Sequence, residues 1–218
     1  MTGIVFPYGT RVALASAMDG VMPMTALSNA KDAVATVESG HDFFIGDVVA
    51  IDSGWAGVDR RAAVVSGVLG QTVALGGLDT RDLSRYPAGA GVGALYRVLN
   101  WCVLSSVLGS EGSGGAMQYV TRSQDGDLDE ERVPGVRSPR ALTLTLPDDP
   151  SALWWSVLEG AAESRAKYPM RIDLPNGTRL VACARVEFNT WPDLNINRAL
   201  TVSAVFSLCA APIRYSAT

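Results

Sequence analysis

Apolar and polar residues alternate along much of this chain, most clearly in its C-terminal half. In 142–146, for example, Leu142, Leu144 and Leu146 alternate with two threonines. A period of two places successive side chains on opposite faces of a strand, and one apolar face per strand is typical of antiparallel sheets. The pattern predicts strands at 98–107, 142–146, 170–174, 179–188 and 200–208. We therefore expect a mainly β protein whose principal body is an antiparallel sandwich or curled sheet.

The alternation also predicts which face of each strand is buried. On 98–107, Leu99, Trp101 and Val103 are expected to face the core, opposite Asn100 and Cys102. The side chains on 179–188 expected to face away from the core are Arg179, Cys183, Arg185 and Glu187. These outward positions are candidates for a water-exposed surface.

One flanking helix is predicted, at about 150–166. Asp148-Asp149-Pro150 supplies an acidic N-cap followed by proline at the first helical position. Apolar residues then recur at helical spacing, so this stripe should lie on the sheet. Trp154 and Trp155 cannot both face the core, because helical neighbours diverge by about 100°. One of them therefore either contacts another subunit or packs at the edge of the core.

The first hundred residues contain shorter strands and smaller side chains. After a short strand near Val12 and Leu14, strands are predicted at 33–37, 47–52, 61–66 and 71–75, separated by Gly-containing turns. We interpret 24–97 as a small β module inserted into the main domain, which then comprises 1–23 and 98–218. The glycine-rich segment 87–94 marks the boundary.

The segment 109–140 is rich in glycine and then in charge, with acidic residues followed by basic ones. Asp125, Asp127 and Asp129 alternate as in a calcium loop. An EF-hand also requires Gly at loop position six and Glu at twelve, where this chain has Glu130 and Val136. The pattern therefore favours a long polar hairpin that is ordered by meeting a neighbour.

Composition and charge exclude several classes of protein. The 218 residues are 48% hydrophobic and 18% charged, which excludes overall disorder. The net charge of −4 argues against a basic surface that grips nucleic acid. Of the basic residues only Lys31 and Lys167 are lysines, and an arginine-rich set favours fixed ion pairs at interfaces.

The sequence offers few residues for catalysis or metal binding. His41 is the only histidine, and no G-x-S-x-G, Gly-Lys or H-E-x-x-H motif occurs. Cys102, Cys183 and Cys209 lack C-x-x-C spacing, so we expect reduced thiols and no metal, cofactor or catalytic site. The N-terminus lacks the charge and apolar run of a signal peptide, and no run approaches the ~20 apolar residues of a membrane span. We expect a soluble protein without a membrane anchor, made in the cytoplasm.

A series of short fragments, in order over nearly the whole chain, resembles the tail tube proteins (major tail proteins) of long, non-contractile-tailed, siphovirus-type bacteriophages. The fragments are Ser28-Asn29-Ala30, Gly46-Asp47, Ser53-Gly54-Trp55, Gly77-Leu78-Asp79-Thr80, Tyr86-Pro87-Ala88-Gly89, Trp101, Gly114-Gly115, Gln118-Tyr119, Ser138-Pro139, Asp148-Asp149-Pro150, Pro175-Asn176-Gly177 and Phe206-Ser207-Leu208. No single fragment is diagnostic, and the specificity lies in their order.

The resemblance implies a β-sandwich flanked by a helix, with six copies forming a ring whose strands join into a continuous inner β-barrel. Stacked rings would form a virion tail tube, assembled in the host cytoplasm, that conducts DNA as a cargo that does not adhere. The implied partners are further copies, a tape measure protein inside, a terminator at one end and a tail tip at the other. Pairing sheet edges between subunits would also remove those edges.

The resemblance to tail tube proteins suggests roles for the polar strand faces and for the charged loop. Asp173 and Glu187 are candidate lumen carboxylates, with ordinary solvent exposure or cross-strand ion pairing as the alternative. Trp155 and Trp191 are candidate subunit contacts. The candidate ring-stacking residues, with an ordinary solvated loop as the alternative, are Asp125, Asp127, Asp129, Glu130, Glu131, Arg132, Arg137 and Arg140. The module 24–97 would lie on the tube exterior, where it disturbs neither barrel nor lumen.

Three other functions stay open from the sequence. A tail terminator or head–tail joining protein would form a single ring. A monomeric β-sandwich binding carbohydrate would use exposed Trp55, Trp155 and Trp191 as a stacking platform. An enzyme working through carboxylate pairs, such as a glycosidase, would need a pair that the sequence does not place.

Overall fold

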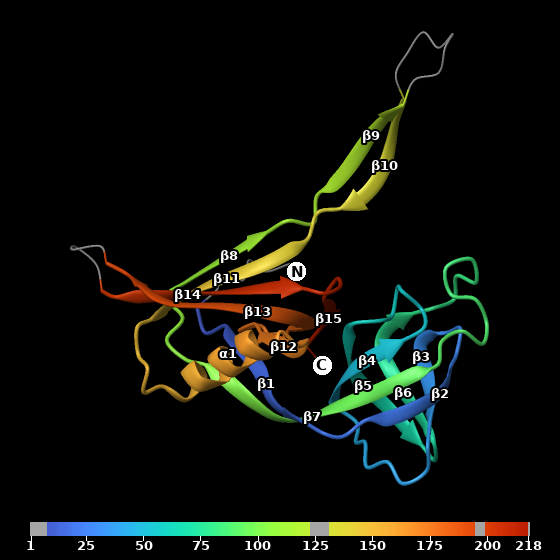
Figure 1. The fold of residues 1–218 in the computed structure, drawn as a ribbon. Coiled ribbons are helices and arrows are strands. Elements are labelled where there is room, and N and C mark those ends of the chain that lie inside the picture. Colours follow the sequence, from blue (N-terminus) through green and yellow to red (C-terminus); the bar gives the residue numbers. More distant parts are fainter. Residues whose placement is uncertain (1–7, 123–130, 195–198, 218) are drawn as a thin grey trace.

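The computed structural model describes residues 8–122, 131–194 and 199–217. In these ranges the chain is mainly β with one helix, and its strands form two bodies joined along one long strand, β7 (Gly93–Leu104) (Figure 1). The strand order through both bodies is β2-β3-β6-β5-β4-β7-β1-β12-β13-β14-β11-β8, and neighbouring strands are antiparallel. The predicted fold class, mainly antiparallel β with one helix and a small extra β module, is confirmed.

The first body is a closed barrel in the N-terminal half, and β2 closes it by pairing with the start of β7, as in Met22 opposite Leu95. Its strands are β2 (Met22–Leu27), β3 (Lys31–Val37), β4 (Val48–Ser53), β5 (Arg61–Leu69), β6 (Thr72–Asp79) and the first part of β7. Small β-branched and alanine side chains suit such a narrow interior, which Ile51, Trp55 and Leu75 fill. Closure leaves no free sheet edge in this body.

The second body, the curled sheet, continues from the second part of β7. Its other strands are β1 (Arg11–Met18), β12 (Tyr168–Asp173), β13 (Arg179–Asp193), β14 (Thr201–Leu208), β11 (Arg140–Pro147) and β8 (Gly109–Ser113). Leu14, Leu144 and Phe206 lie fully buried on one face. Helix α1 (Leu153–Ser164) covers this face and packs against β13 and β7. The alternation that predicted β11 and β14 therefore reflects real one-sided burial.

The start of α1 differs from the prediction. The helix begins at Leu153 with Ala152 at the N-cap position and no capping side chain. The carboxylate of Asp149 instead accepts hydrogen bonds from the backbone N (3.1 Å) and hydroxyl (2.6 Å) of Ser151, in a turn before the helix. The predicted N-cap is therefore wrong, and burial of Trp154 and Leu158 stabilises the helix in its place.

On β13 the predicted core face is correct, but one position expected to be exposed to water is not. Cys183 and its neighbour Val181 are buried, because this end of β13 packs against Val48 and Ala62 of the barrel. An alternating pattern cannot reveal a second buried face when the covering residues come from a distant module.

On β7 the inward and outward faces are exchanged. Leu104 is buried and Cys102 packs beside it, whereas Leu99 and Val103 are about half exposed. The pairing of β7 with β1 shifts register at Ala15–Ala17 and Ala17–Met18 as β7 passes from one body to the other. A one-residue shift reverses which face is buried, and no sequence period records it.

The C-terminal strand ties the two bodies together. Strand β15 (Ile213–Tyr215) pairs with β13, yet Ile213 lies in the barrel core. The Tyr215 hydroxyl donates to the carbonyl of Gly76 (2.8 Å) and accepts from the amide of Val64 (2.9 Å). Gly77, at φ +73°, leaves room for this contact, because a Cβ there would lie 2.6 Å from Ile213 Cγ2.

A two-stranded hairpin projects from the curled sheet, formed by β9 (Met117–Arg122) and β10 (Glu131–Arg137) (Figure 1). The polar hairpin predicted here is present in the described residues. Its base leaves the sheet at Gly114 (φ +78°), where a Cβ would lie 1.7 Å from the carbonyl oxygen of Pro139. Glycine is thus required where the two connections cross.

Candidate assembly surfaces

The curled sheet has one polar face that α1 does not cover, formed by β8, β11, β14 and the second half of β13. Glu111, Thr143, Val205 and Glu187 lie opposite one another, strand by strand, in a single cross-strand row. The rows on either side contain Ser113, Ala141, Ser207 and Arg185, and Gly109, Thr145, Ser203 and Asn189. We call this surface, defined by these three rows, the polar face.

Both edges of the polar face lack a strand partner within the described residues. Strand β8 ends the strand order and pairs only with β11. Strand β13 pairs with β12 up to Ala184, and from Arg185 onwards it pairs only with β14. Unpaired edges present backbone N–H and C=O groups that can accept another strand.

The two predicted lumen carboxylates occupy different environments. Glu187 is exposed on the polar face, where the Ser207 hydroxyl lies 3.4 Å from its Oε1. Asp173 is ion-paired with Arg179 (2.6 Å) and Arg171 (3.1 Å), near the barrel. For Asp173 the structure therefore gives the cross-strand pairing that was the alternative, and Glu187 is the free carboxylate of the two.

Glu111 was not predicted as a functional residue. It lies on β8, whose sequence Gly-Ser-Glu-Gly-Ser has no apolar residue to mark a strand. The only available signal was its place in the glycine-rich segment before the charged loop. The structure brings it into the same row as Glu187, so the polar face carries an acidic side chain near each edge.

Of the predicted stacking residues, four lie in the described residues. Glu131 and Arg132 are exposed at the far end of β10, and the Arg132 guanidinium lies 5.0 Å from the centre of the Tyr119 ring. Arg137 and Arg140 lie at the base of the hairpin. Asp125, Asp127, Asp129 and Glu130 fall outside the described residues, as does the calcium-loop alternative. Among the described residues, Glu131 and Arg132 therefore lie at one end of β10 and Arg137 at the other.

The tryptophans differ from one another. Trp155 is half-buried against Phe188, with ring centres 4.9 Å apart, so it packs at the edge of the core. Trp191, near the end of β13, is 75% exposed. Trp55 is buried, and its indole N–H donates to the carbonyl of Pro87 (2.8 Å). The three-tryptophan stacking platform of a carbohydrate-binding module is therefore absent, since one member is internal.

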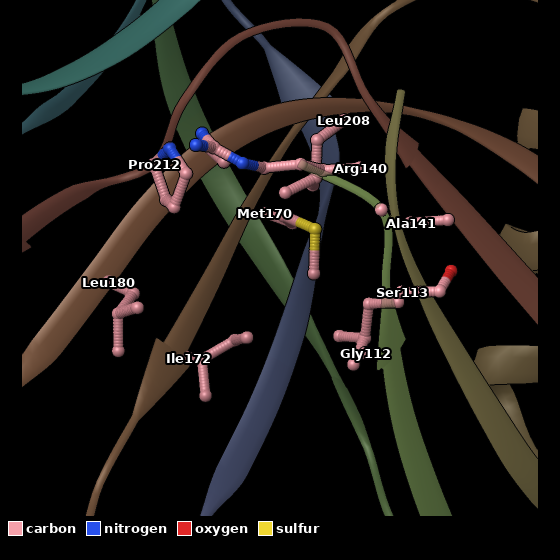
Figure 2. Close-up of a pocket in the computed structure, with 12 residues that line it drawn as sticks. Gly112, Ser113, Arg140, Ala141, Met170, Ile172, Leu180, Leu208 and Pro212 are labelled. Atoms are coloured by element: carbon pink, nitrogen blue, oxygen red, sulfur yellow. The ribbon is translucent and has the colours of Figure 1, made fainter. Parts of the chain in front are cut away.

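An apolar pocket of about 280 Å³ opens on the helix-covered side of the curled sheet. Figure 2 shows Met170, Ile172 and Leu180 facing Gly112 and Ser113 of β8 across it, with the Arg140 side chain along its rim. The pocket has few polar groups to orient a small molecule, which a specific ligand site needs.

The described residues contain no group of three or more His, Cys, Asp or Glu side chains that could hold a metal ion. The His41 Nε2 lies 2.7 Å from the carbonyl of Gly70. Burial raises the pKa of the Cys183 thiol to about 12, with Cys209 acting in the same direction, so this thiol stays protonated at neutral pH. No helix in the described part is long and apolar enough to cross a membrane.

Most of the chain matches a known protein family. The family described as "Phage tail tube protein, TTP" matches residues 53–217. No curated protein matches the chain. A chain of the "Cryo-EM structure of the anti-feeding prophage (AFP) baseplate, 6-fold symmetrised" is similar at a TM-score of 0.38 and 10% identity, over 55% of this chain and 86% of that one.

Proposed function

Because the chain belongs to the family of phage tail tube proteins, we propose that six copies form a ring and that the rings stack into the hollow tail tube that conducts DNA. The protein is a structural component of the virion tail, and the family is not an enzymatic one. The observation that carries the proposal is the polar face with its two unpaired edges. Its tail-protein partners would be a tape measure protein, a terminator and a tail tip.

Ring closure follows from the two free edges. We place the β8 edge of one subunit beside the β13 edge (185–193) of the next, which extends the sheet from subunit to subunit. A head-to-tail contact of two different edges forms a closed ring when the rotation between copies closes. Closure removes every exposed edge of this sheet, which otherwise invites uncontrolled association.

The polar face then lines the lumen, because the helix and the apolar core occupy its other side. Each subunit contributes two carboxylates, Glu111 and Glu187, and one cation, Arg185, to this surface, so the lumen wall carries a net negative charge from every subunit. Duplex DNA carries a negative charge about every 1.7 Å of its axis. Like-charge repulsion keeps such a wall from holding its cargo.

The closed barrel, corresponding to the inserted module, packs on the same side of the curled sheet as the polar face, so its place on the tube exterior stays a prediction. It packs on the opposite side of β13 from α1, through Val181 and Cys183, and only where β13 is not part of the polar face. Its contact therefore leaves both free edges accessible. The β9–β10 hairpin, which projects from the sheet, reaches the next ring.

Cysteine cross-linking tests ring closure directly. We expect a variant combining Glu111→Cys with Glu187→Cys, or with Asn189→Cys one row along, to give an oxidised ladder that ends at six subunits. Each single variant retains the three native cysteines and serves as the matched control. A ladder that is no stronger than in the single variants would remove these edges from the ring contact.

The alternative functions predict different assembly of the purified protein. A terminator or head–tail joining protein would cross-link into a closed ring but would not elongate with concentration. A monomeric module would give neither ladder nor tube. Tube formation by the purified chain therefore separates the proposed function from both.

A further inference from the structure

Four arginines converge on one pocket of about 510 Å³ between the barrel and the curled sheet. Arg61 and Arg85 come from the barrel, and Arg137 and Arg140 come from the base of the β9–β10 hairpin. We call this site the arginine pocket. Its remaining lining residues are small or apolar, and none is a carboxylate.

The arginine pocket has an excess of positive charge that the described residues do not neutralise. None of its four arginines is in an ion pair with a described carboxylate, whereas Arg60, adjacent to Arg61 in the chain, pairs with Asp59 at 2.8 Å. Burial lowers the pKa of Arg61, and the charge of Arg85 acts in the same direction. Four cations around one pocket favour an anion between them.

Local structure holds these side chains in place. Arg61 is fixed by strand pairing opposite Ile51. The Arg85 guanidinium lies 5.5 Å from the centre of the buried Tyr86 ring. Gly115, at φ +82°, leaves space for Arg140, because a Cβ there would lie 2.7 Å from the Arg140 Nε. These contacts restrict where the Arg85 and Arg140 side chains can lie, which lowers the cost of ordering them on a ligand.

We propose that the arginine pocket binds the acidic segment 125–131 of a second copy, in the adjacent ring. This inference rests on the proposed function and assigns part of the stacking contact to the barrel. The segment has Asp125, Asp127, Asp129, Glu130 and Glu131 within seven positions. Arginine pairs with carboxylates through two parallel hydrogen bonds, so the two surfaces are complementary.

The placement of the two surfaces requires a second copy. The arginine pocket lies at the base of the hairpin, and the acidic segment follows the far end of β9, which points away from the body (Figure 1). The seven residues of β10 span roughly 23 Å at a strand rise of ~3.3 Å per residue. Such a contact joins one end of each copy to the opposite end of the next copy. It can therefore repeat along the tube without closing into a ring, as stacking requires.

A charge-swap series tests the proposal in the full-length chain. We expect Arg61→Glu with Arg85→Glu to form rings that no longer stack, and Asp127→Arg with Asp129→Arg to do the same. Combining all four substitutions restores complementarity between copies and should restore tubes. Arg11→Glu with Arg214→Glu, at two exposed arginines outside the pocket, is the control of equal charge change and should stack normally.

Arg61 is half-buried, so its variant could fail to fold. Arg85→Glu alone, at an exposed position, keeps the test open and should shorten tubes. Tubes of normal length from Arg85→Glu and from the double pocket variant would overturn the pocket proposal. Absence of tubes from the unmodified protein would instead overturn the proposed function, so the two failures are distinguishable.

Peptide binding distinguishes a site that is specific for the acidic segment from a site that binds any anion. The receptor is the full-length chain with its acidic segment neutralised by Asp125→Asn, Asp127→Asn, Asp129→Asn, Glu130→Gln and Glu131→Gln. A peptide of residues 123–131 should bind it one to one, and Arg85→Glu in this receptor should weaken binding about tenfold or more. The same peptide with Asn and Gln at its acidic positions should not bind. Displacement by inorganic phosphate at concentrations equal to the peptide's would overturn the assignment of the segment as the ligand.

Discussion

The ammonium Nζ of Lys167 lies 2.8 Å from Oδ1 of Asp52. Lys167 lies between α1 and β12 of the curled sheet, and Asp52 lies on β4 of the barrel, so this pair links the two bodies. Burial opposes protonation of Lys167, but the hydrogen bond to Asp52 raises the pKa of this lysine overall. The link holds the barrel beside the sheet while both edges of the polar face stay free.

Replacing Lys167 by Met should loosen this link without unfolding either body. Both side chains are about a third to a half exposed, so we expect a loss below about 1 kcal/mol in the free energy of unfolding. That corresponds to a fall of about 2–4 °C in Tm at most. Calorimetry measures the fall, and Lys31→Met, at an exposed lysine without an ion pair among the described residues, is the control. A larger loss from Lys31→Met than from Lys167→Met would contradict this role.

Because the thiol of Cys183 is buried, we expect the free energy of unfolding to fall at alkaline pH. An unfolded thiol titrates near pH 8.5, whereas burial raises the pKa of Cys183 to about 12 in the folded protein. The unfolded state therefore loses its proton first as the pH rises. The contribution of the protonated thiol to the free energy of unfolding is complete below about pH 8. It falls between about pH 9 and 12, by up to about 1.4 kcal/mol per pH unit.

Urea unfolding from pH 8 to 10.5, with reductant present, measures this effect. The difference in stability between the unmodified protein and Cys183→Ala should shrink as the pH rises. Parallel curves for the two proteins would show that Cys183 ionises equally in both states.

Gly114 should be intolerant of substitution. Its positive φ and the crossing Pro139 carbonyl leave no room for a Cβ, so Gly114→Ala must displace the base of the hairpin. The left-handed conformation alone costs roughly 1–2 kcal/mol for a residue with a side chain. We expect Gly114→Ala to keep the barrel and curled sheet but to stack poorly. Gly112→Ala, where no atom lies within 4 Å of the added Cβ, is the control. Normal tubes from Gly114→Ala would contradict the account of this turn.

If Glu187 lines the lumen, a charge reversal there should affect DNA passage but not tube assembly. Glu187→Lys places a cation on the polar face and should leave tubes intact while slowing or blocking DNA release, because the wall then attracts phosphate. Dye-detected DNA release from particles that contain the variant measures the rate. Glu163→Lys, on the exposed side of α1, should have no effect. Equal rates for both variants would remove Glu187 from the lumen.

The sequence predicted the strands that bury one face. Strands β11 and β14 were recognised because Leu144 and Phe206 alternate with polar residues and are fully buried. Asn176-Gly177 is a dipeptide that favours tight turns, and Gly177 adopts φ +78° between β12 and β13. These features depend on local pattern and turn chemistry, which a single chain displays directly.

The remaining features depend on contacts between distant segments. Burial of Cys183 requires the barrel, and the acidic row requires β8 to bring Glu111 into line with Glu187. The arginine pocket joins residues from positions 61 and 140. The acidic segment of the hairpin was predicted as a contact, but its proposed binding site was not, because that site exists only after the barrel and the curled sheet have packed together.

Negative-stain microscopy of the purified protein at rising concentration tests most directly whether this chain assembles into rings that stack. We predict hollow tubes that lengthen with concentration, and a folded variant lacking residues 124–133 that forms rings without stacking. Single rings at every concentration would indicate a terminator-like protein, and featureless monomers throughout would contradict assembly altogether.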